Sequence, residues 1–316
     1  MDLIIDGNYI LYRNVFSLTR DKMLYGLLQD SLEKSVDSYI KQYSFDNVYL
    51  VSDSLTNWRK KIYPEYKGTR KKDSNIDWEF VMTIYKEFKE NLPSRVSLFE
   101  KNLVEGDDWV SYLTKKSNRE GKSVLIVSND GDLKQLLTTG DTFINVMIND
   151  NSNHDYIFLP LEYKTWLAKF NENIEVPSIF DDEISQDLEL YNYIKYIISK
   201  REIKNTTREK VLFEKIIGGD RGDNVKSVYI KNNRGIGEKT AEKIYEKYLE
   251  YFGIPKFDEE CFNRMSDIVI EQKKLDQSEY DKILENILFN NKIVNLHTIP
   301  KDIKKIMESY SYGRVN

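Results

Sequence analysis

The feature that most constrains the fold is a set of short apolar runs, several of which end in acidic residues. Runs of this length, bounded by Asp, Asn or Gly, are typical of buried parallel strands. In an open parallel sheet the carboxyl ends of the strands converge on one crevice. Acids that follow such runs or start neighbouring turns are therefore expected to share that crevice. They are Asp6, Asp53, Glu105, Asp107, Asp108, Asp130, Asp132, Asp220 and Asp223.

Nine carboxylates in one crevice would carry a large negative charge that cations must neutralise. Pointed at one crevice, they would repel one another and raise their own pKa values unless cations lay among them. Oxygen ligands of this kind suit hard divalent metals, and a pair of such metals serves in-line attack on phosphodiesters. The sequence thus favours a two-metal site for phosphodiester hydrolysis.

Composition narrows the class of protein. The 316 residues are 40% apolar and 31% charged, which is ordinary for a soluble globular chain. The only cysteine, Cys261, excludes an intrachain disulfide and favours a reducing compartment. His154 and His297 lack Cys or His neighbours at zinc spacing, which argues against a zinc site. Neither a signal peptide nor an apolar run of membrane-spanning length is visible.

The net charge of −5 conceals local basic patches. Between residues 58 and 72 only Glu65 is acidic, whereas seven residues are basic: Arg59, Lys60, Lys61, Lys67, Arg70, Lys71 and Lys72. If the nine acids bind metal, much of the negative charge is internal. Local patches rather than the total charge then set the electrostatic footprint for nucleic acid.

The chain divides into an α/β half and a helical half. Strands are expected at 2–6, 47–52, 96–99, 123–128 and 143–148, alternating with helices at 22–42, 76–91, 106–118 and 131–138. This alternation predicts a mainly parallel central sheet flanked by helices. From residue 160 onward helices are expected at 160–172, 186–200, 207–217, 238–251, 260–274 and 278–290. The expected domains are 1–180 and 181–316, with Pro177 and the acidic run 181–183 as a connector.

A glycine motif marks the helical half. Gly235-Ile236-Gly237 allows a tight turn, and a helix is expected to begin directly after it. A helix N-terminus offers free N–H groups and a favourable dipole to a phosphate. Lys239 and Lys243 lie one turn apart and can face the backbone of a duplex together. An ordinary Gly-rich loop before a helix is the alternative, because short glycine motifs are weak evidence.

Taken in order, the motifs resemble the flap endonuclease and 5′–3′ exonuclease family, and the layout is closest to bacteriophage members such as the phage ribonuclease H. The matching motifs extend over residues 1 to about 248, and the remainder carries none. They are Asp6-Gly7, Asp53, Tyr66-Lys67-Gly68-Thr69-Arg70, Glu105-Gly106-Asp107-Asp108, Ser128-Asn129-Asp130-Gly131-Asp132, Gly219-Asp220-Arg221-Gly222-Asp223-Asn224 and Gly235-Ile236-Gly237-Glu238-Lys239-Thr240-Ala241.

The resemblance implies a metal centre. Two or more Mg²⁺ ions are expected, with Mn²⁺ able to substitute. Asp6, Asp53, Glu105 and Asp107 match the first metal site of the family. Asp130, Asp132 and Asp220 match the second, and Asp108 and Asp223 act nearby or through water. A strand-end or turn aspartate that caps a helix is the alternative for any one of them.

The resemblance also implies contacts to DNA. In the family, the basic segment 57–75 would form an arch, Lys67 matches the lysine at its base, and Arg70 matches the neighbouring basic residue. Both side chains would stabilise negative charge on the scissile phosphate. The acids Asp130 and Asp132 are the expected catalytic acids beside them. A solvated basic loop is the alternative for Lys67 and Arg70. Tyr12 matches a stacking aromatic and Arg13 a phosphate contact, although burial of Tyr12 by a first helix is also consistent. The remaining expected contacts are Arg59, Lys71, Gly235, Gly237, Lys239, Thr240 and Lys243, in a helix–hairpin–helix motif at 234–248.

Two departures from the family leave the exact docking of a duplex, and a K⁺ ion at the hairpin, open. The linker of residues 225–233 lacks the usual Pro-Gly turn, and the stretch 160–217 is longer than in the shortest members.

We interpret the chain as a structure-specific, metal-dependent 5′-nuclease. Flapped, nicked or RNA-primed duplex DNA is the expected substrate, and a bacterial cytoplasm the expected location. A monomer is expected, with a single-strand-binding protein and a sliding clamp as candidate partners and no membrane contact. Two alternatives stay open: a single-strand ribonuclease of a PIN-like fold, and a catalytically silent DNA-binding module.

Overall fold

The chain forms two compact units. The computed structural model describes residues 1–18, 26–71, 73–150, 154–173 and 182–310. Unit 1 comprises Met1–Thr56, Lys72–Thr206 and Lys301–Asn316, and unit 2 comprises Asn57–Lys71 and Thr207–Pro300. The division therefore follows residue 206 instead of residue 180, and the basic segment 57–71 belongs to unit 2. The expected helix start at residue 22, Pro177 and residue 181 of the connector lie outside the described residues.

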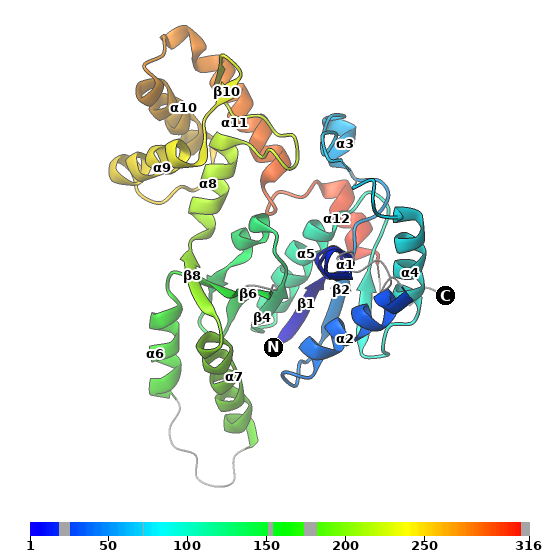
Figure 1. Cartoon of the computed structure of the whole chain (residues 1–316). Helices are drawn as coiled ribbons and strands as arrows, with labels where there is room; N and C mark the ends of the chain where they lie inside the picture. The colour runs from blue at the N-terminus through cyan, green and yellow to red at the C-terminus, as the bar shows by residue number, and fades with distance from the viewer. Residues whose placement is uncertain (19–25, 72, 151–153, 174–181, 311–316) are drawn as a thin grey trace. The chain divides into compact units, whose positions relative to one another are not determined.

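Unit 1 is built on a mainly parallel sheet, as predicted (Figure 1). Its order is β3-β2-β1-β4-β6-β7-β8, and β5 pairs with β6. Within this sheet, among the described strands, only the pairs β6–β7 and β5–β6 are antiparallel. The strands are β1 (Asp2–Asp6), β2 (Val48–Val51), β3 (Val96–Phe99), β4 (Val124–Val127), β5 (Thr138–Thr139), β6 (Ile144–Asp150), β7 (Asp155–Pro160) and β8 (Glu202–Thr206).

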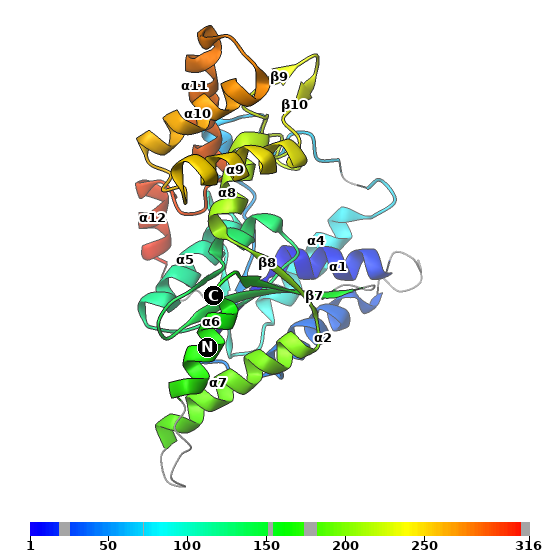
Figure 2. The same ribbon diagram turned by 90° about the vertical axis from the view of Figure 1, so that its left-hand side faces the viewer.

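Helices cover both faces of the sheet, because successive side chains of a strand point to opposite faces. Leu3 and Ile5 join the core that α1 and α2 share, whereas α5 packs on β1, β2 and β4. Figure 2 shows α1 and α5 on different sides of the strands. The helices of unit 1 are α1 (Gly7–Leu18), α2 (Leu28–Ile40), α4 (Trp78–Glu90), α5 (Gly106–Arg119), the 3-10 helix η2 (Gly131–Leu136), α6 (Tyr163–Asn173), α7 (Asp182–Ser199) and α12 (Lys301–Glu308).

Unit 2 is helical, with its own hydrophobic core around Phe213, Ile244 and Met265. Tyr66 of the segment 57–71 is buried in the same core, which explains why this distant segment folds here. A short hairpin of β9 and β10 lies between α8 and α9 in the chain. The elements are α3 (Arg59–Ile62), α8 (Arg208–Gly218), β9 (Ile230–Lys231), β10 (Arg234–Gly235), α9 (Glu238–Phe252), α10 (Glu259–Lys273), the 3-10 helix η3 (Gln277–Glu279) and α11 (Tyr280–Val294).

Among the described residues, no helix is both long enough and apolar enough to cross a bilayer.

Candidate active site

Asp6 stands at the carboxyl end of the central strand β1. The pKa of its carboxyl is raised to about 6, mainly by burial and to a smaller extent by the negative charges of Asp53 and Asp130, while two hydrogen bonds lower it. Those bonds come from the Ser128 hydroxyl at 2.7 Å and the Tyr9 N–H at 3.1 Å. The carboxylates that follow β1, β2 and β4 therefore influence one another, as the sequence predicted for strand ends in a shared crevice.

The first turn of α5 brings further acids to the ends of these strands. The Gly106 N–H donates to Asp53 Oδ1 at 2.6 Å, which ties the end of β2 to the start of α5. A side chain at residue 106 would crowd this contact, because its Cβ would lie 3.2 Å from Asp53 Oδ1. Glu105 and Asp108 form a reciprocal capping box, and both are buried. Asp108 thus has a structural role as a helix cap, while Asp107 on the same turn is half-buried.

Asp130 and Asp132 open the short 3-10 helix η2 that follows β4. The Asp132 N–H donates to Asp130 Oδ1 at 2.8 Å, and the Asp130 N–H donates to Ser128 Oγ at 3.0 Å. The expected α-helix over 131–138 is therefore a shorter 3-10 turn that fixes these two acids. Their carboxylate oxygens, like those of Asp6, Asp53, Glu105 and Asp107, are of the kind that Mg²⁺ and Mn²⁺ prefer as ligands.

Asp220 and Asp223 lie in unit 2, on the turn after α8. Burial alone would raise the pKa of Asp220, but the ion pair with Lys215 and the N–H groups of Gly222 and Asp223 hold that pKa below its usual value. The Gly222 N–H donates to Asp220 Oδ1 at 2.7 Å. This carboxyl is therefore ionised across the neutral pH range, as a metal ligand must be.

Segment 57–71 is bound to that same turn. Arg70 forms an ion pair of 2.6 Å with Asp223 Oδ1, and the Tyr66 hydroxyl donates to Asp223 Oδ2 at 2.6 Å. The Lys67 N–H donates to the Asp223 carbonyl at 3.0 Å, and Asn224 Nδ2 donates to the Glu65 carbonyl at 3.0 Å. Both oxygens of Asp223 thus accept hydrogen bonds from the segment that the sequence assigned to an arch.

Lys67 has a strained backbone. Its φ of 56° lies in the left-handed region, which costs a non-glycine residue roughly 1–2 kcal/mol. Gly68 follows it, and a Cβ at residue 68 would lie 2.9 Å from the Glu65 carbonyl. Strained residues held by their surroundings often occur at functional sites.

Arg59 is placed differently from the expectation. It was predicted to contact DNA, but it is 2% exposed and donates from Nε to the Ile293 carbonyl at 2.8 Å. Its guanidinium also lies 4.5 Å from the centre of the Trp58 ring. Arg59 therefore fastens segment 57–71 to α11, whereas Lys71 is exposed as a DNA contact must be.

Tyr12 and Arg13, which are neighbours on α1, differ in exposure and in contacts. Tyr12 is 45% exposed and contacts the rings of Phe16 and Trp78, so α1 does not bury it. Arg13 is half-buried and donates to the Tyr39 hydroxyl at 2.8 Å and to the Asp150 carbonyl at 3.2 Å. These bonds give Arg13 a structural role that the sequence did not indicate, while Tyr12 keeps the exposure needed for stacking.

The glycine motif places a helix start where the sequence predicted one. Gly237 is the N-cap of α9, and its carbonyl accepts hydrogen bonds from the N–H groups of Thr240 and Ala241 at 2.9 Å each. Lys239 and Lys243 are exposed on the first two turns of α9, and Gly235 ends β10.

Sequence reasoning missed the residues that hold the acids in place. Ser128 contacts both Asp6 and Asp130, Lys215 pairs with Asp220, and Tyr66 donates to Asp223. Ser128 and Tyr66 stand inside motifs that carry the resemblance, so their position was a signal. No signal in the sequence marked Lys215, because a lysine on a helix is usually a solvated side chain.

Comparisons with known proteins agree with this arrangement. The family described as "5′-3′ exonuclease, N-terminal resolvase-like domain" matches residues 2–162, which is more than half of the chain. A 5′–3′ exonuclease of Buchnera aphidicola is 26% identical over 193 residues, covering 56% of this chain and 64% of the relative. DNA polymerase I of Bacillus subtilis is 25% identical over 262 residues, covering 78% of this chain and 23% of the polymerase. The chain thus spans less than two thirds of the length of these relatives.

The phage ribonuclease H is also among the matches. The enzyme of Enterobacteria phage T4 is 29% identical over 123 residues, which cover 36% of this chain and 39% of that protein. A solved structure of the phage T5 5′-exonuclease with bound zinc ions has a TM-score of 0.59 and 21% identity, covering 98% of this chain and 99% of that one. The phage T5 D15 flap endonuclease, in complex with DNA and metal ions, has a TM-score of 0.57 and 20% identity, covering 97% and 98%. These likenesses establish the fold.

The sequence match and the fold lead to the same group of proteins. The match to residues 2–162 covers the acids that follow β1, β2 and β4 together with those of α5. The solved structures share the arrangement of strands and helices over nearly the whole chain. The chain therefore belongs to the 5′–3′ exonuclease family.

Proposed function

We propose that the chain is a metal-dependent 5′-nuclease that cuts phosphodiester bonds at the junctions of flapped or nicked duplex DNA. The observation that carries this proposal is the group formed by Asp6, Asp53 and Asp130, whose mutual repulsion contributes to the raised pKa of Asp6. A carboxyl whose pKa is raised by neighbouring carboxylates is poised for a cation. Family membership supplies the class of reaction.

The protein's own groups orient these acids. Ser128 fixes Asp6 relative to Asp130, and the Gly106 N–H fixes Asp53. Divalent ions bound by them would neutralise the site, activate a water and stabilise the leaving oxygen. We assign Asp6, Asp53, Glu105 and Asp107 to one ion and Asp130 and Asp132 to another. In unit 2, we propose Asp220 as a metal ligand. We also propose Lys67, Arg70 and Lys71 as contacts to substrate phosphates.

In unit 2, we propose that the turn at Gly235–Gly237 and the start of α9 act as a helix–hairpin–helix motif toward the duplex. The support is the N-cap of Gly237 and the exposure of Lys239 and Lys243 on one side of α9. The neighbouring Thr240 and a K⁺ ion at the turn belong to the same proposal.

The test is cleavage of a 5′-flap duplex labelled separately at the 5′ and 3′ ends of the flap strand. Asp130→Asn is the informative variant, because an amide oxygen can still accept the Asp132 N–H while the negative charge is lost. Asp141→Asn removes the same charge from an exposed loop of unit 1 and serves as the control. We expect cuts near the junction that require Mg²⁺, persist in Asp141→Asn and disappear in Asp130→Asn.

The same assay separates the alternatives. A single strand of equal length, cut as fast as the flap, would indicate a single-strand ribonuclease or nuclease instead. Duplex binding without any cleavage would indicate a silent binding module. The phage ribonuclease H relative makes an RNA–DNA hybrid a third substrate to include, because its cleavage would extend the proposal to RNA primers.

A further inference from the structure

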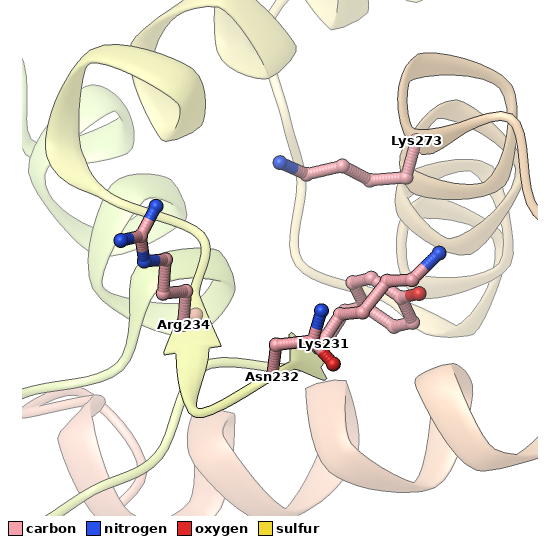
Figure 3. A pocket seen from close by; sticks show the side chains of 6 residues that line it. Lys231, Asn232, Arg234 and Lys273 are labelled. Carbon is pink, nitrogen blue, oxygen red and sulfur yellow. The ribbon is translucent and has the colours of Figure 1, made fainter.

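The proposed function already accounts for the basic pocket of unit 2. This pocket has a volume of about 550 Å³, and Arg234 and Lys273 are among the residues that line it (Figure 3). Gly235, which also lines it, belongs to the turn that we assign to the duplex. The pocket therefore carries no separate role, whereas the C-terminal helix α12 of unit 1 has no part in the function as proposed.

The C-terminal helix carries none of the family motifs, yet it is an integral part of the α/β unit. α12 and Tyr310 belong to unit 1, although the preceding residues up to Pro300 belong to unit 2. Ile303 and Met307 of α12 are buried. Figures 1 and 2 both show α12 beside α5. The helix therefore returns the chain to the unit that carries most of the candidate metal ligands.

Tyr310, just after α12, packs into a cluster of aromatic rings. Its N–H donates to the Met307 carbonyl at 3.1 Å, which ties it to the end of the helix. Its ring centre lies 5.6 Å from that of Phe99 and 5.3 Å from that of Trp109, and those two ring centres are 5.1 Å apart. Each of the three rings thus contacts the other two, and such pairs stabilise a fold beyond the area that they bury.

These rings join two elements that lead to the candidate site. Phe99 is the last residue of β3, and the fully buried Trp109 directly follows Asp108 in the first turn of α5. The Trp109 N–H donates to the Glu105 carbonyl at 3.2 Å. A shift of the Trp109 ring would therefore be transmitted to the turn that carries Glu105, Asp107 and Asp108.

The connection between β3 and α5 is strained and needs support. Leu103 has a φ of 74°, in the left-handed region, where leucine is a rare outlier. Conformations of this kind persist only where the surroundings over-determine them. One support is the Thr56 carbonyl, which accepts the Leu103 N–H at 3.1 Å. Another is Tyr310, because the ammonium of Lys101, in the same connection, lies 5.8 Å from the centre of the Tyr310 ring.

We propose that Tyr310 and α12 brace the first turn of α5 and so position Glu105 and Asp107 for a divalent cation. The inference rests on the proposed function, because it assumes that these acids bind a metal. Tyr310 acts through Trp109 and Phe99, which makes it a positioning residue and not a catalytic one. The final part of the described chain thus helps to build the site, although no motif marks it.

The test compares Tyr310→Ala, which removes the ring, with Tyr310→Phe, which keeps it. Calorimetric titration of the full chain with Mg²⁺ should show an affinity about 3- to 10-fold lower in Tyr310→Ala, a smaller loss than the roughly 10- to 100-fold common for a direct partner of a metal ligand. Tyr310→Phe should bind Mg²⁺ with the affinity of the wild-type protein, because the ring packing is retained. A role in stability alone would leave the Mg²⁺ affinity of every folded variant the same.

Hydrogen exchange in the absence of metal measures the brace directly. The N–H groups of Glu105, Gly106 and Trp109 donate within the strand-end crevice, to Asp108 Oδ2, Asp53 Oδ1 and the Glu105 carbonyl respectively. Their exchange therefore reports opening of the first turn of α5. Loss of two aromatic contacts should make that exchange roughly 10- to 100-fold faster in Tyr310→Ala and leave it unchanged in Tyr310→Phe.

Tyr43→Ala is the matched control. Tyr43 is a half-buried tyrosine of unit 1, as Tyr310 is, but its ring packs against those of Phe45 and Tyr193. Thermal unfolding of each variant first establishes that the fold is kept. Equal Mg²⁺ affinity in Tyr310→Ala and the wild-type protein, or equal losses in Tyr310→Ala and Tyr43→Ala, would overturn the proposal. So would a loss in Tyr310→Phe as large as that in Tyr310→Ala.

Cleavage of the flap substrate separates this proposal from the nuclease assignment. If Tyr310→Ala lost Mg²⁺ affinity but the wild-type protein never cut the flap, the nuclease assignment would fail and the brace would stand. If the wild-type protein cut the flap with Mg²⁺ and Tyr310→Ala bound Mg²⁺ equally well, the brace alone would fail.

Discussion

At the scale of single residues, Ser128 controls the orientation of the acids that follow β1 and β4. Its hydroxyl donates to Asp6 and accepts from the Asp130 N–H, so one side chain orients two candidate ligands. Its hydrogen bond also lowers the pKa of Asp6, against the effect of burial. A group of this kind acts on metal binding through the ligands that it positions.

Ser128→Ala is therefore expected to weaken Mg²⁺ binding by about 10-fold or more, as loss of an outer partner of a metal ligand commonly does. Loss of the hydrogen bonds should also lower the free energy of unfolding by about 1 kcal/mol. Calorimetric Mg²⁺ titration and denaturant unfolding measure the two effects. Ser266→Ala, which removes a buried hydroxyl of α10 in unit 2, controls for the stability loss alone. Equal Mg²⁺ affinity in all three proteins would contradict the prediction.

Glu214 is a second residue with a consequence for stability. Burial between α8 and α9 raises the pKa of its carboxyl to about 7, with Glu242 and Glu238 adding to the rise and Lys210 opposing it. The folded chain therefore holds this proton while the unfolded chain releases it near the ordinary value of 4.5. Stability should decrease as pH rises from about 4.5 to 7 and then level off.

Glu214→Gln should flatten this part of the pH profile and raise the free energy of unfolding at pH 8, on the order of 1–3 kcal/mol. The measurement is urea unfolding at pH values from 4.5 to 8. Glu250→Gln, an exposed acid on α9, is the matched control. A pH profile that Glu214→Gln leaves unchanged would show that this carboxyl ionises normally in the folded chain.

At the scale of elements, the first helix carries an aromatic surface. Tyr12 and Phe16 are 45% and 47% exposed, and their rings stack with centroids 6.1 Å apart. The ring of Trp78, at the start of α4, lies 5.4 Å from Tyr12. Exposed aromatic rings in a row suit the stacking of unpaired bases. We propose that Phe16 and the half-buried Trp78 share the stacking role that the sequence predicted for Tyr12.

Phe16→Ala is expected to weaken binding of a 5′-flap substrate by about 5- to 150-fold, which corresponds to roughly 1–3 kcal/mol for one stacked base. Blunt duplex should be bound with unchanged affinity, because it offers no unpaired base. Fluorescence anisotropy with both substrates distinguishes the two outcomes. Leu55→Ala, at a fully exposed apolar side chain of unit 1, is the control. An equal loss on flap and blunt duplex would indicate a general defect instead of stacking.

Elements differ in how much the sequence could reveal about them. The strands β1, β2, β3, β4 and β6 were predicted, because each is a buried apolar run. β8 was missed, since Glu202–Thr206 is an edge strand with exposed, largely polar residues and no apolar signal. Asp6, Asp53 and Asp130 were predicted at the ends of strands for the same reason as the strands β1, β2 and β4 that precede them. The bonds of Asp223 to Tyr66 and Arg70 join residues far apart in the chain, which no local pattern encodes.

At the scale of the whole molecule, the chain passes between its two units four times, at residues 56–57, 71–72, 206–207 and 300–301. Segment 57–71 enters unit 2 through the buried Tyr66 and Arg59 and through the turn at Asp223. The basic residues Lys67 and Arg70 are therefore positioned by the helical unit, although their neighbours in sequence belong to the sheet. The stability of this segment should follow that of unit 2.

Tyr66→Phe tests this coupling, because it keeps the buried ring and removes only the hydroxyl that donates to Asp223. A hydrogen bond to a charged group is worth about 1.5–3 kcal/mol, so local opening should become roughly 10- to 100-fold more frequent. Hydrogen exchange should accelerate together in residues 63–70 and 220–224, where the Lys67 N–H bonds to the Asp223 carbonyl. Tyr251→Phe, at an exposed tyrosine of α9, should leave the hydrogen exchange of both segments unchanged.

Faster exchange in β1 and β4, with residues 220–224 unaffected, would mean that segment 57–71 takes its stability from the sheet. In that case the hydrogen bond from Tyr66 to Asp223 would not be the contact that holds Lys67 and Arg70 in place.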